Sequence, residues 1–166
     1  IARRLAEAGA NVLVGDIDEG LARTAAAELD GSWSSRVLGT VMDVTDSATV
    51  KAAADLAVRE FGGVDIWVNN AGIFPCVPLP EMSDELWDRV LAVNTRGVFA
   101  GAREAARCMR AGDRGGVIVN VASVGGFGPG PFMATYCATK AFVLSFSESL
   151  ATEVRGTGVH VRCVCP

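Results

Sequence analysis

The chain has 166 residues, half of them hydrophobic and a fifth charged, with a formal net charge of −4. This length fits one domain that can bury a core, and an acidic chain without a basic cluster argues against nucleic-acid binding. No uncharged apolar run reaches the ~20 residues that a membrane span requires, so we expect no membrane segment.

The five cysteines are scattered without a Cys-x-x-Cys motif, and the one histidine, His160, has no ligand-like neighbours. This pattern argues against a zinc site. Reduced cysteines are typical of cytoplasmic proteins, so we expect a cytoplasmic protein. Cys137 adjoins Tyr136, and we expect it to pack as a small buried hydrophobe rather than to act in redox chemistry.

The hydrophobic pattern predicts helices and strands in alternation. The predicted helices span residues 1–8, 19–29, 47–61, 83–110 and 136–154. The predicted strands span residues 11–16, 37–42, 64–69, 117–121 and 159–164. Asp18 is placed to cap the helix at 19–29, and residues 31–36 read as a loop.

The predicted strands are short apolar runs rather than polar/apolar alternations. This is typical of a parallel sheet covered on both faces, so we predict a doubly wound, Rossmann-like α/β fold in one domain, residues 1–166. The chain does not begin with Met, opens within a helical pattern and stops at Pro166, just after an apolar strand. We interpret it as a piece of a longer protein.

Polar or glycine residues follow the predicted strands at Asp16, Asp43, residues 69–72 and Ser123. Ligands of open parallel sheets bind beyond the carboxyl ends of the strands. An acid at such an end can hold the ribose hydroxyls of a nucleotide or cap the following helix, and both interpretations stay open for Asp16 and Asp43.

Tyr136 and Lys140 lie four residues apart on a predicted helix, which places them on one face about 6 Å apart. At an effective dielectric of ~20, a lysine charge at that distance favours the phenolate by roughly 3 kcal/mol and lowers the tyrosine pKa. Tyr136 could then act as a general acid/base, and Ser123 could bind the same substrate oxygen. The pair also fits an ordinary amphipathic helix.

Two further features lie near these residues. The loop at 125–130 is rich in glycine but lacks the Gly-x-Gly-x-x-Gly spacing, and its prolines remove amide donors, so we interpret it as a hinge beside a substrate pocket. Asn94 falls within a helical pattern, where it is either a surface residue or a buried polar group that disturbs the helix.

Taken in order, these motifs resemble the short-chain dehydrogenase/reductase family over essentially the whole chain. Asp43-Val44 resembles its adenine-contacting pair, and Asn69-Asn70-Ala71-Gly72 resembles its Asn-Asn-Ala-Gly motif. Four residues match the family's active-site positions: Asn94, Ser123, Tyr136 and Lys140. Cys165-Pro166 resembles the start of the segment that borders the nicotinamide.

The resemblance implies an oxidoreductase that transfers a hydride between NAD(H) and a small alcohol or ketone. Tyr136 would be the acid/base, Ser123 would orient the substrate oxygen, Lys140 would bind the nicotinamide ribose, and Asn94 would hold a water. Asp16 implies NAD rather than NADP, since a carboxylate repels the 2′-phosphate. The residues implied to bind cofactor are Asp16, Ile17, Asp43, Val44, Asn70, Ala71, Gly72, Tyr136 and Lys140.

Against the family pattern, the usual first strand and its glycine-rich phosphate loop are missing before Ile1. A non-catalytic nucleotide-binding or assembly module and a sugar-nucleotide epimerase stay open as alternatives. The helices at 83–110 and 136–154 carry more apolar residues than one core-facing side of a helix can bury, among them Phe99 and Phe142. We therefore expect a homodimer or homotetramer. The substrate pocket would include Phe74, Cys76 and residues 124–133, which have an apolar tendency.

Overall fold

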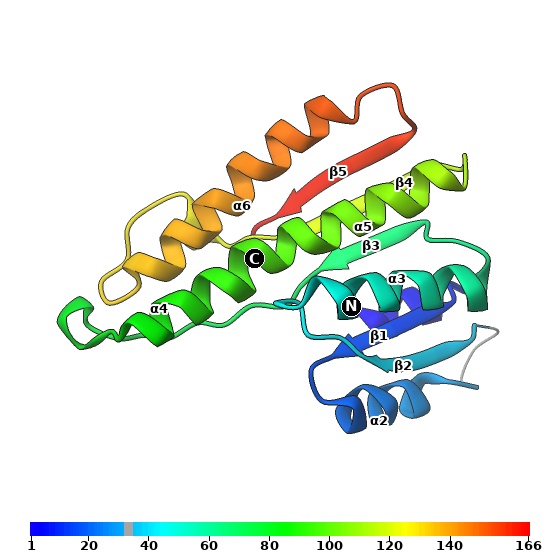
Figure 1. Cartoon of the computed structure of the whole chain (residues 1–166), viewed down its shortest axis with the longest axis horizontal. Coiled ribbons are helices and arrows are strands. Elements are labelled where there is room, and N and C mark those ends of the chain that lie inside the picture. The colour runs from blue at the N-terminus through cyan, green and yellow to red at the C-terminus, as the bar shows by residue number, and fades with distance from the viewer. Residues whose placement is uncertain (32–34) are drawn as a thin grey trace. The chain divides into compact units, whose positions relative to one another are not determined.

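The computed structural model describes residues 1–31 and 35–166, which form two compact units (Figure 1). Unit 1 comprises Ile1–Gly62 and unit 2 comprises Gly63–Pro166, and each is described by itself. The predicted loop at 31–36 includes residues 32–34, which lie outside the described residues.

Unit 1 is a two-stranded parallel sheet with helices. Its elements are α1 (Ala2–Glu7), β1 (Val12–Asp16), α2 (Glu19–Leu29), β2 (Val37–Val41) and α3 (Ser47–Phe61). The register runs from Val12 opposite Val37 to Asp16 opposite Val41. Small and branched apolar residues form its core: Ala6, Val12, Ala26, Leu29 and Val37.

The helices of unit 1 begin and end where local chemistry requires it. Asp18 caps α2, as predicted, because its carboxylate accepts a hydrogen bond from the Leu21 N–H at 3.1 Å. The Asp46 carboxylate caps α3 in the same way, accepting from the Ala48 N–H at 2.8 Å. The α3 helix ends at Gly62, whose φ of 80° is left-handed and suits glycine.

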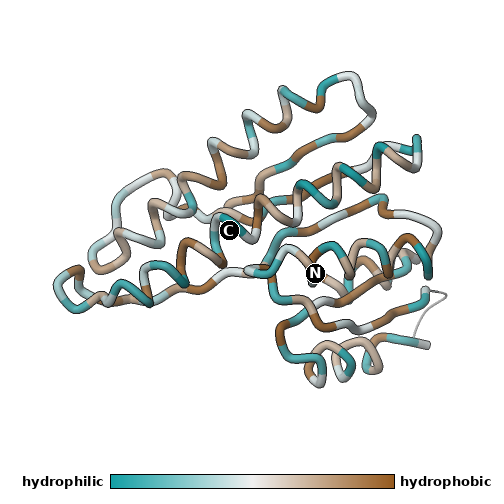
Figure 2. The backbone as a smooth tube through the Cα atoms, viewed as in Figure 1, coloured by the Kyte–Doolittle hydropathy of each residue, from teal (hydrophilic) through white to brown (hydrophobic). Residues whose placement is uncertain are grey.

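Unit 2 carries a three-stranded parallel sheet in the order β3-β4-β5. Its strands are β3 (Ile66–Asn69), β4 (Gly116–Val121) and β5 (Val159–Val164). Its helices are η1 (Leu79–Glu81), α4 (Asp84–Leu91), η2 (Ala92–Arg96), α5 (Gly97–Ala111), η3 (Val124–Gly126) and α6 (Ala134–Glu153). Helix α5 packs on β3 and β4, and α6 packs on β5 (Figure 1). Figure 2 shows that the strands are mostly apolar.

The predicted α/β class is confirmed, because every strand pair among the described residues is parallel and helices alternate with strands. Two details differ from the prediction. The helical region from 83 is interrupted by the π-helical turn η2, and α6 begins at Ala134, two residues before Tyr136. Among the described residues, no helix has both the length and the apolarity needed to cross a membrane.

The side-chain amides of β3 and β4 form a hydrogen-bond network that connects these strands to α6. The Asn69 Nδ2 group donates to Asn120 Oδ1 at 2.8 Å, and Asn120 Nδ2 donates to Ser147 Oγ on α6 at 2.9 Å. Trp67 Nε1 donates to Asn69 Oδ1 at 2.7 Å. A Cβ at Gly101 would stand 2.0 Å from that oxygen, so this helix position requires glycine if the network is to form.

Candidate active site

Asn94 lies in the π-helical turn η2 and is 1% exposed. Its Oδ1 accepts from the Ile73 N–H at 2.9 Å, while its Nδ2 donates to the Ile73 carbonyl at 2.9 Å and to Thr139 Oγ1 at 3.1 Å. Both amide hydrogens are therefore used within the protein, and Oδ1 keeps one lone pair for a further partner. Of the two possibilities that the sequence left open for Asn94, the structure shows the buried polar group in a disturbed helix rather than the surface residue.

Tyr136 and Lys140 share one face of α6. The Lys140 Nζ atom lies 5.6 Å from the centroid of the Tyr136 ring, which agrees with the spacing expected from the sequence. Lys140 is 5% exposed, and its ammonium donates to the Val121 carbonyl at the end of β4 at 2.8 Å. The ammonium is thus anchored to the sheet beside the phenol ring.

Ser123 follows β4 and caps η3, where its Oγ accepts from the Gly125 N–H at 3.2 Å. A Cβ at Gly125 would stand 3.6 Å from Cε1 of Tyr136 and 3.7 Å from Ser123 Oγ. The serine and the tyrosine therefore flank the same glycine. The hydroxyl proton of Ser123 remains available to donate to another oxygen.

The space above Gly72 suits a polar ligand group. A Cβ there would stand 3.5 Å from Asn94 Oδ1 and 3.6 Å from Lys140 Nζ, so glycine leaves open a position that an acceptor and a donor both face. Asn70, Ala71 and Gly72 are exposed on the loop after β3. A ribose hydroxyl can both donate and accept, so this cradle fits the sugar of a nucleotide.

Burial lowers the pKa of Lys140 from its ordinary value, because the folded chain removes water from the ammonium. Cys163 and Cys165 act in the opposite direction on this pKa. Burial also raises the pKa of the Cys165 thiol, which lies beside Cys163 and the backbone N–H of Ser123. The Lys140 ammonium is thus less hydrated than a surface lysine, which strengthens its electrostatic interactions with neighbouring groups.

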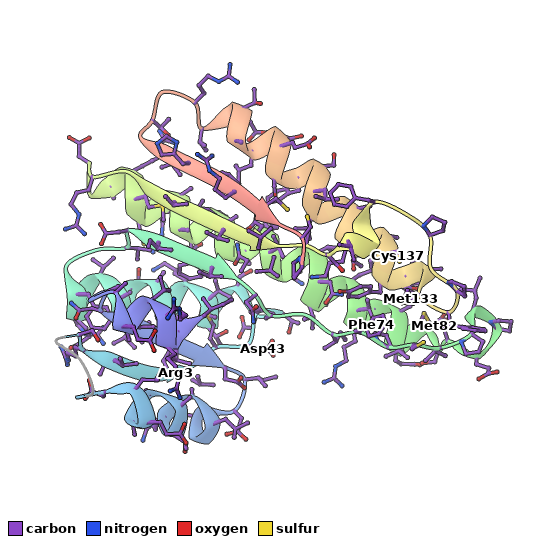
Figure 3. The ribbon with its side chains drawn as sticks, turned by 180° about the vertical axis from the view of Figure 1, so that it is seen from behind. Arg3, Asp43, Phe74, Met82, Met133 and Cys137 are labelled. Atoms are coloured by element: carbon purple, nitrogen blue, oxygen red, sulfur yellow. The ribbon has the colours of Figure 1, made fainter. Side chains whose placement is uncertain are left out.

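A loop on either side of the site brings apolar side chains to Tyr136. Phe74, after β3, meets the Tyr136 ring edge-on with the centroids 4.5 Å apart. Thr135 Oγ1 lies 3.1 Å from Met82 Sδ, which joins the start of α6 to the end of η1. Figure 3 shows Phe74, Met82, Met133 and Cys137 at the same end of unit 2.

The remaining predicted cofactor residues belong to unit 1. Asp16 and Ile17 are exposed after β1, and one Asp16 carboxylate oxygen accepts from the Asp18 N–H at 3.0 Å. Asp43, followed by Val44, is half-buried and accepts from the N–H and hydroxyl of Thr45 at 2.8 and 2.7 Å. Neither acid caps a helix, since Asp18 and Asp46 do so.

Within unit 2, the structure therefore brings together Asn94, Ser123, Tyr136, Lys140 and Gly72. Sequence reasoning missed Thr139, which is 1% exposed and whose hydroxyl donates to the Tyr136 carbonyl at 2.7 Å while accepting from Asn94. A threonine within a helix that bonds back to an earlier carbonyl could have suggested it.

The glycine-rich loop has a packing role at Gly126. A Cβ there would stand 3.0 Å from the Lys140 carbonyl oxygen and 2.8 Å from Leu144 Cδ1, so glycine lets the loop approach α6 closely. Cys137 is buried, as predicted, and none of the five cysteines, all of which belong to the described residues, forms a disulfide. Among the described residues, no group of three metal-ligating side chains comes together.

Comparisons with known proteins agree with this geometry. A model of the family described as short chain dehydrogenase matches residues 1–166. The chain is 39% identical to a hydroxy-methyl-oxo-hexahydroindene-carboxyl-CoA reductase of Mycobacterium tuberculosis, covering 99% of this chain and 63% of that protein. It is 36% identical to the sorbitol dehydrogenase of Cereibacter sphaeroides, covering 100% of this chain and 65% of that protein.

The crystal structure of a short chain dehydrogenase from Mycobacterium smegmatis superposes with a TM-score of 0.95 at 38% identity, covering 99% of this chain and 69% of that one. The chain spans somewhat less than two thirds of the length of the two curated relatives.

Proposed function

Because the chain belongs to the short-chain dehydrogenase family, we propose that its full-length gene product is an oxidoreductase that interconverts a secondary alcohol and a ketone. The observation that carries the proposal is the grouping of the Tyr136 ring, the buried Lys140 ammonium and the Ser123 hydroxyl around Gly125 and the end of β4. A phenol, a hydroxyl donor and a fixed cation are the groups that proton transfer to an alcohol oxygen requires.

The chemistry divides among these groups. Tyr136 exchanges a proton with the substrate oxygen, and Ser123 donates a hydrogen bond to the same oxygen and holds it in place. Lys140, anchored on the Val121 carbonyl, supplies positive charge beside the phenol. Bound nicotinamide supplies the hydride acceptor or donor.

Asn94 and Lys140 hold the cofactor side of the site in this proposal. Asn94 Oδ1 and Lys140 Nζ both face the position that Gly72 leaves open, where a ribose hydroxyl can be held. A water that joins the proton path would donate to the free lone pair of Asn94 Oδ1. Asn70 and Ala71 directly precede Gly72 in the chain, and we assign them to the same part of the cofactor site.

Members of this family use nicotinamide nucleotides, and we assign NAD rather than NADP to this chain. The carboxylate of Asp16 is exposed beyond β1 and is engaged by one backbone N–H, which leaves an acceptor free for a ribose hydroxyl. A phosphate at that hydroxyl would be repelled by the carboxylate. Ile17, Asp43 and Val44 complete the proposed adenosine side.

Replacing Tyr136 by phenylalanine tests the acid/base role in the full-length gene product. The ring and its contact with Phe74 remain, so NAD affinity is expected to stay within about twofold while turnover falls about 10³-fold. Ser123→Ala is expected to lower turnover about 10²-fold, and Ser149→Ala, an exposed serine on α6, serves as its control. Unchanged turnover in Tyr136→Phe rejects the assignment, and tight NAD binding without any hydride exchange favours a binding module.

We also propose that the protein forms a homodimer or homotetramer through the helices of unit 2. Phe99 on α5 and Phe142 on α6 are 44% and 41% exposed, and Phe142 stacks on Phe146 with the centroids 5.6 Å apart. Light scattering on the full-length gene product measures this directly, and a monomer would contradict it.

A further inference from the structure

The proposed function leaves the substrate open, since the names of the two relatives refer to a fused-ring CoA ester and to a sugar alcohol. The side chains around Tyr136 narrow this choice. Two loops frame the site, one at residues 70–80 after β3 and one at 123–135 between β4 and α6, and neither contains a charged residue. The Val77 N–H donates to the Phe132 carbonyl at 3.2 Å, so the two loops lie side by side.

Large apolar side chains on these loops face water. Phe74, Val124, Phe127 and Phe132, which we call the apolar rim, are 52%, 66%, 73% and 60% exposed. Phe74 contacts the Tyr136 ring, Val124 follows Ser123 directly, and the Phe127 N–H donates to the Val124 carbonyl. Phe74, Val124 and Phe127 are therefore adjacent to the two groups that we assign to the reaction, and Phe132 joins them through the Val77 N–H on the loop of Phe74. Exposed apolar surface next to a reactive group is typical of a binding surface.

The backbone at Phe132 supports a role for its side chain. Its φ is 61°, a left-handed conformation that is strained for a bulky residue and natural for glycine. Nothing in the packing of the described residues requires the ring, which is largely exposed. Strain of this kind persists at sites where a side chain has to be presented in a particular direction.

The loops offer few hydrogen bonds to a ligand. Thr135 and Thr139 are 3% and 1% exposed, and their hydroxyls contact Met82 Sδ and the Tyr136 carbonyl. Lys140 is buried and bonded to the Val121 carbonyl. The further hydroxyls of a sugar alcohol would therefore find few side-chain partners on the loops, and the phosphates of a coenzyme ester would find no cation there.

We propose that the apolar rim selects secondary alcohols and ketones carried on an apolar aliphatic ring system, with the reacting oxygen as the one polar group near the site. The inference rests on the proposed function, because it takes Ser123 and Tyr136 as the groups that bind that oxygen. Phe74 and Phe132 are then residues that determine specificity, through the apolar surface of the substrate that they cover.

The experiment compares three alcohols with the full-length gene product: cyclohexanol, decalol and sorbitol. We expect kcat/KM for decalol to exceed that for cyclohexanol about tenfold and that for sorbitol about 100-fold. If kcat/KM for sorbitol equals that for decalol, the proposed substrate class is wrong while the proposed function still holds. No hydride exchange with any of the three would overturn both.

Two variants locate the selectivity. Phe132→Gly removes the ring and relaxes the left-handed backbone, so the fold is retained while the preference for decalol over cyclohexanol falls about fivefold. Phe74→Ala is expected to lower the same ratio, and Val58→Ala, an exposed apolar residue on α3, is the control that leaves it unchanged. A ratio that is the same in Phe132→Gly, Phe74→Ala and the control would overturn the role of the rim.

Discussion

The two units bury different kinds of side chain. Eight polar residues are buried among those that the structure describes, and unit 1 contributes one of them, Ser35. The other seven lie in unit 2: Asn94, Glu104, Asn120, Thr135, Thr139, Lys140 and Ser147. The acids of unit 1 that we assign to the cofactor instead lie at the surface or half-buried and bond to neighbouring residues.

This difference shows how each unit places functional groups. A strand-end acid such as Asp16 is positioned by its own turn, so a short stretch of sequence is enough to predict it. Buried polar groups cost free energy unless they are paired, so their partners have to be supplied by distant parts of the chain. In unit 2 the partners of the Asn94 amide are 21 and 45 residues away, at Ile73 and Thr139, and the partner of Lys140 is a carbonyl 19 residues away.

The largest effect is expected when the buried charge is removed. Lys140→Met keeps the length of the side chain but removes the cation beside Tyr136 and the bond to Val121, so turnover is expected to fall about 10²–10³-fold. Lys51→Met, which removes an exposed lysine of α3, is the control and should leave turnover unchanged. Equal turnover of the two variants would contradict the role of the buried ammonium.

The same substitution predicts a pH effect on stability. Because burial lowers the pKa of Lys140 in the folded state, the unfolded chain holds its proton up to a higher pH. Stability then rises with pH between the lowered value and the unfolded value near 10.5. Urea unfolding across this window should show a gain in the native protein that Lys140→Met lacks. Parallel curves for both proteins would be inconsistent with a desolvated lysine.

The next largest effect is expected when the hydrogen-bond network of side-chain amides in unit 2 is broken. Asn120 is 0% exposed, and Asn120→Ala removes its hydrogen bonds with the half-buried Asn69 amide and with the buried Ser147 hydroxyl and leaves a cavity between them. We expect the free energy of unfolding to fall by about 3 kcal/mol. Asn11→Ala in unit 1 removes one exposed bond to the Arg36 N–H and should cost about 1 kcal/mol or less. Similar losses in urea unfolding would remove the distinction between the units.

A smaller effect is expected at Thr139, which positions other residues. Thr139→Val keeps the shape of the side chain but removes the hydrogen bonds of the hydroxyl with the Asn94 amide and the Tyr136 carbonyl, so kcat is expected to fall about tenfold. Thr139→Ser restores the hydroxyl and should return kcat to within about twofold of the native value. If Thr139→Ser is as slow as Thr139→Val, methyl packing rather than the hydrogen bond explains the loss.

The smallest effect on stability is expected at Asp16. Its exposed carboxylate accepts one backbone hydrogen bond, so Asp16→Ala should change the free energy of unfolding by less than about 1 kcal/mol. The ratio of kcat/KM for NADP to that for NAD should rise about tenfold, because repulsion of the 2′-phosphate is removed. An unchanged ratio would remove Asp16 from the cofactor assignment.

Most helices and strands could be predicted because their signals are local. The apolar run at residues 117–121, the cap at Asp18 and the glycine at 62 each act within a few residues, and the observed boundaries differ by one or two positions. The π-helical turn at Ala92–Arg96 could not be predicted in this way. It depends on the backbone of Ile73 and on Thr139, which bond to Asn94 from elsewhere in the fold.

The sequence by itself determined the order of the elements and the placing of Tyr136 and Lys140 on one helical face, because a spacing of four residues has one geometric consequence in a helix. The tertiary structure decided which polar groups are buried and which apolar rings are exposed. Asn94 and Lys140 are buried, Asn94 bonded to Thr139 and Lys140 to the Val121 carbonyl, while Phe74 and Phe132 face water. A local sequence pattern cannot predict which of these side chains are buried, because burial depends on what the rest of the chain places against each side chain.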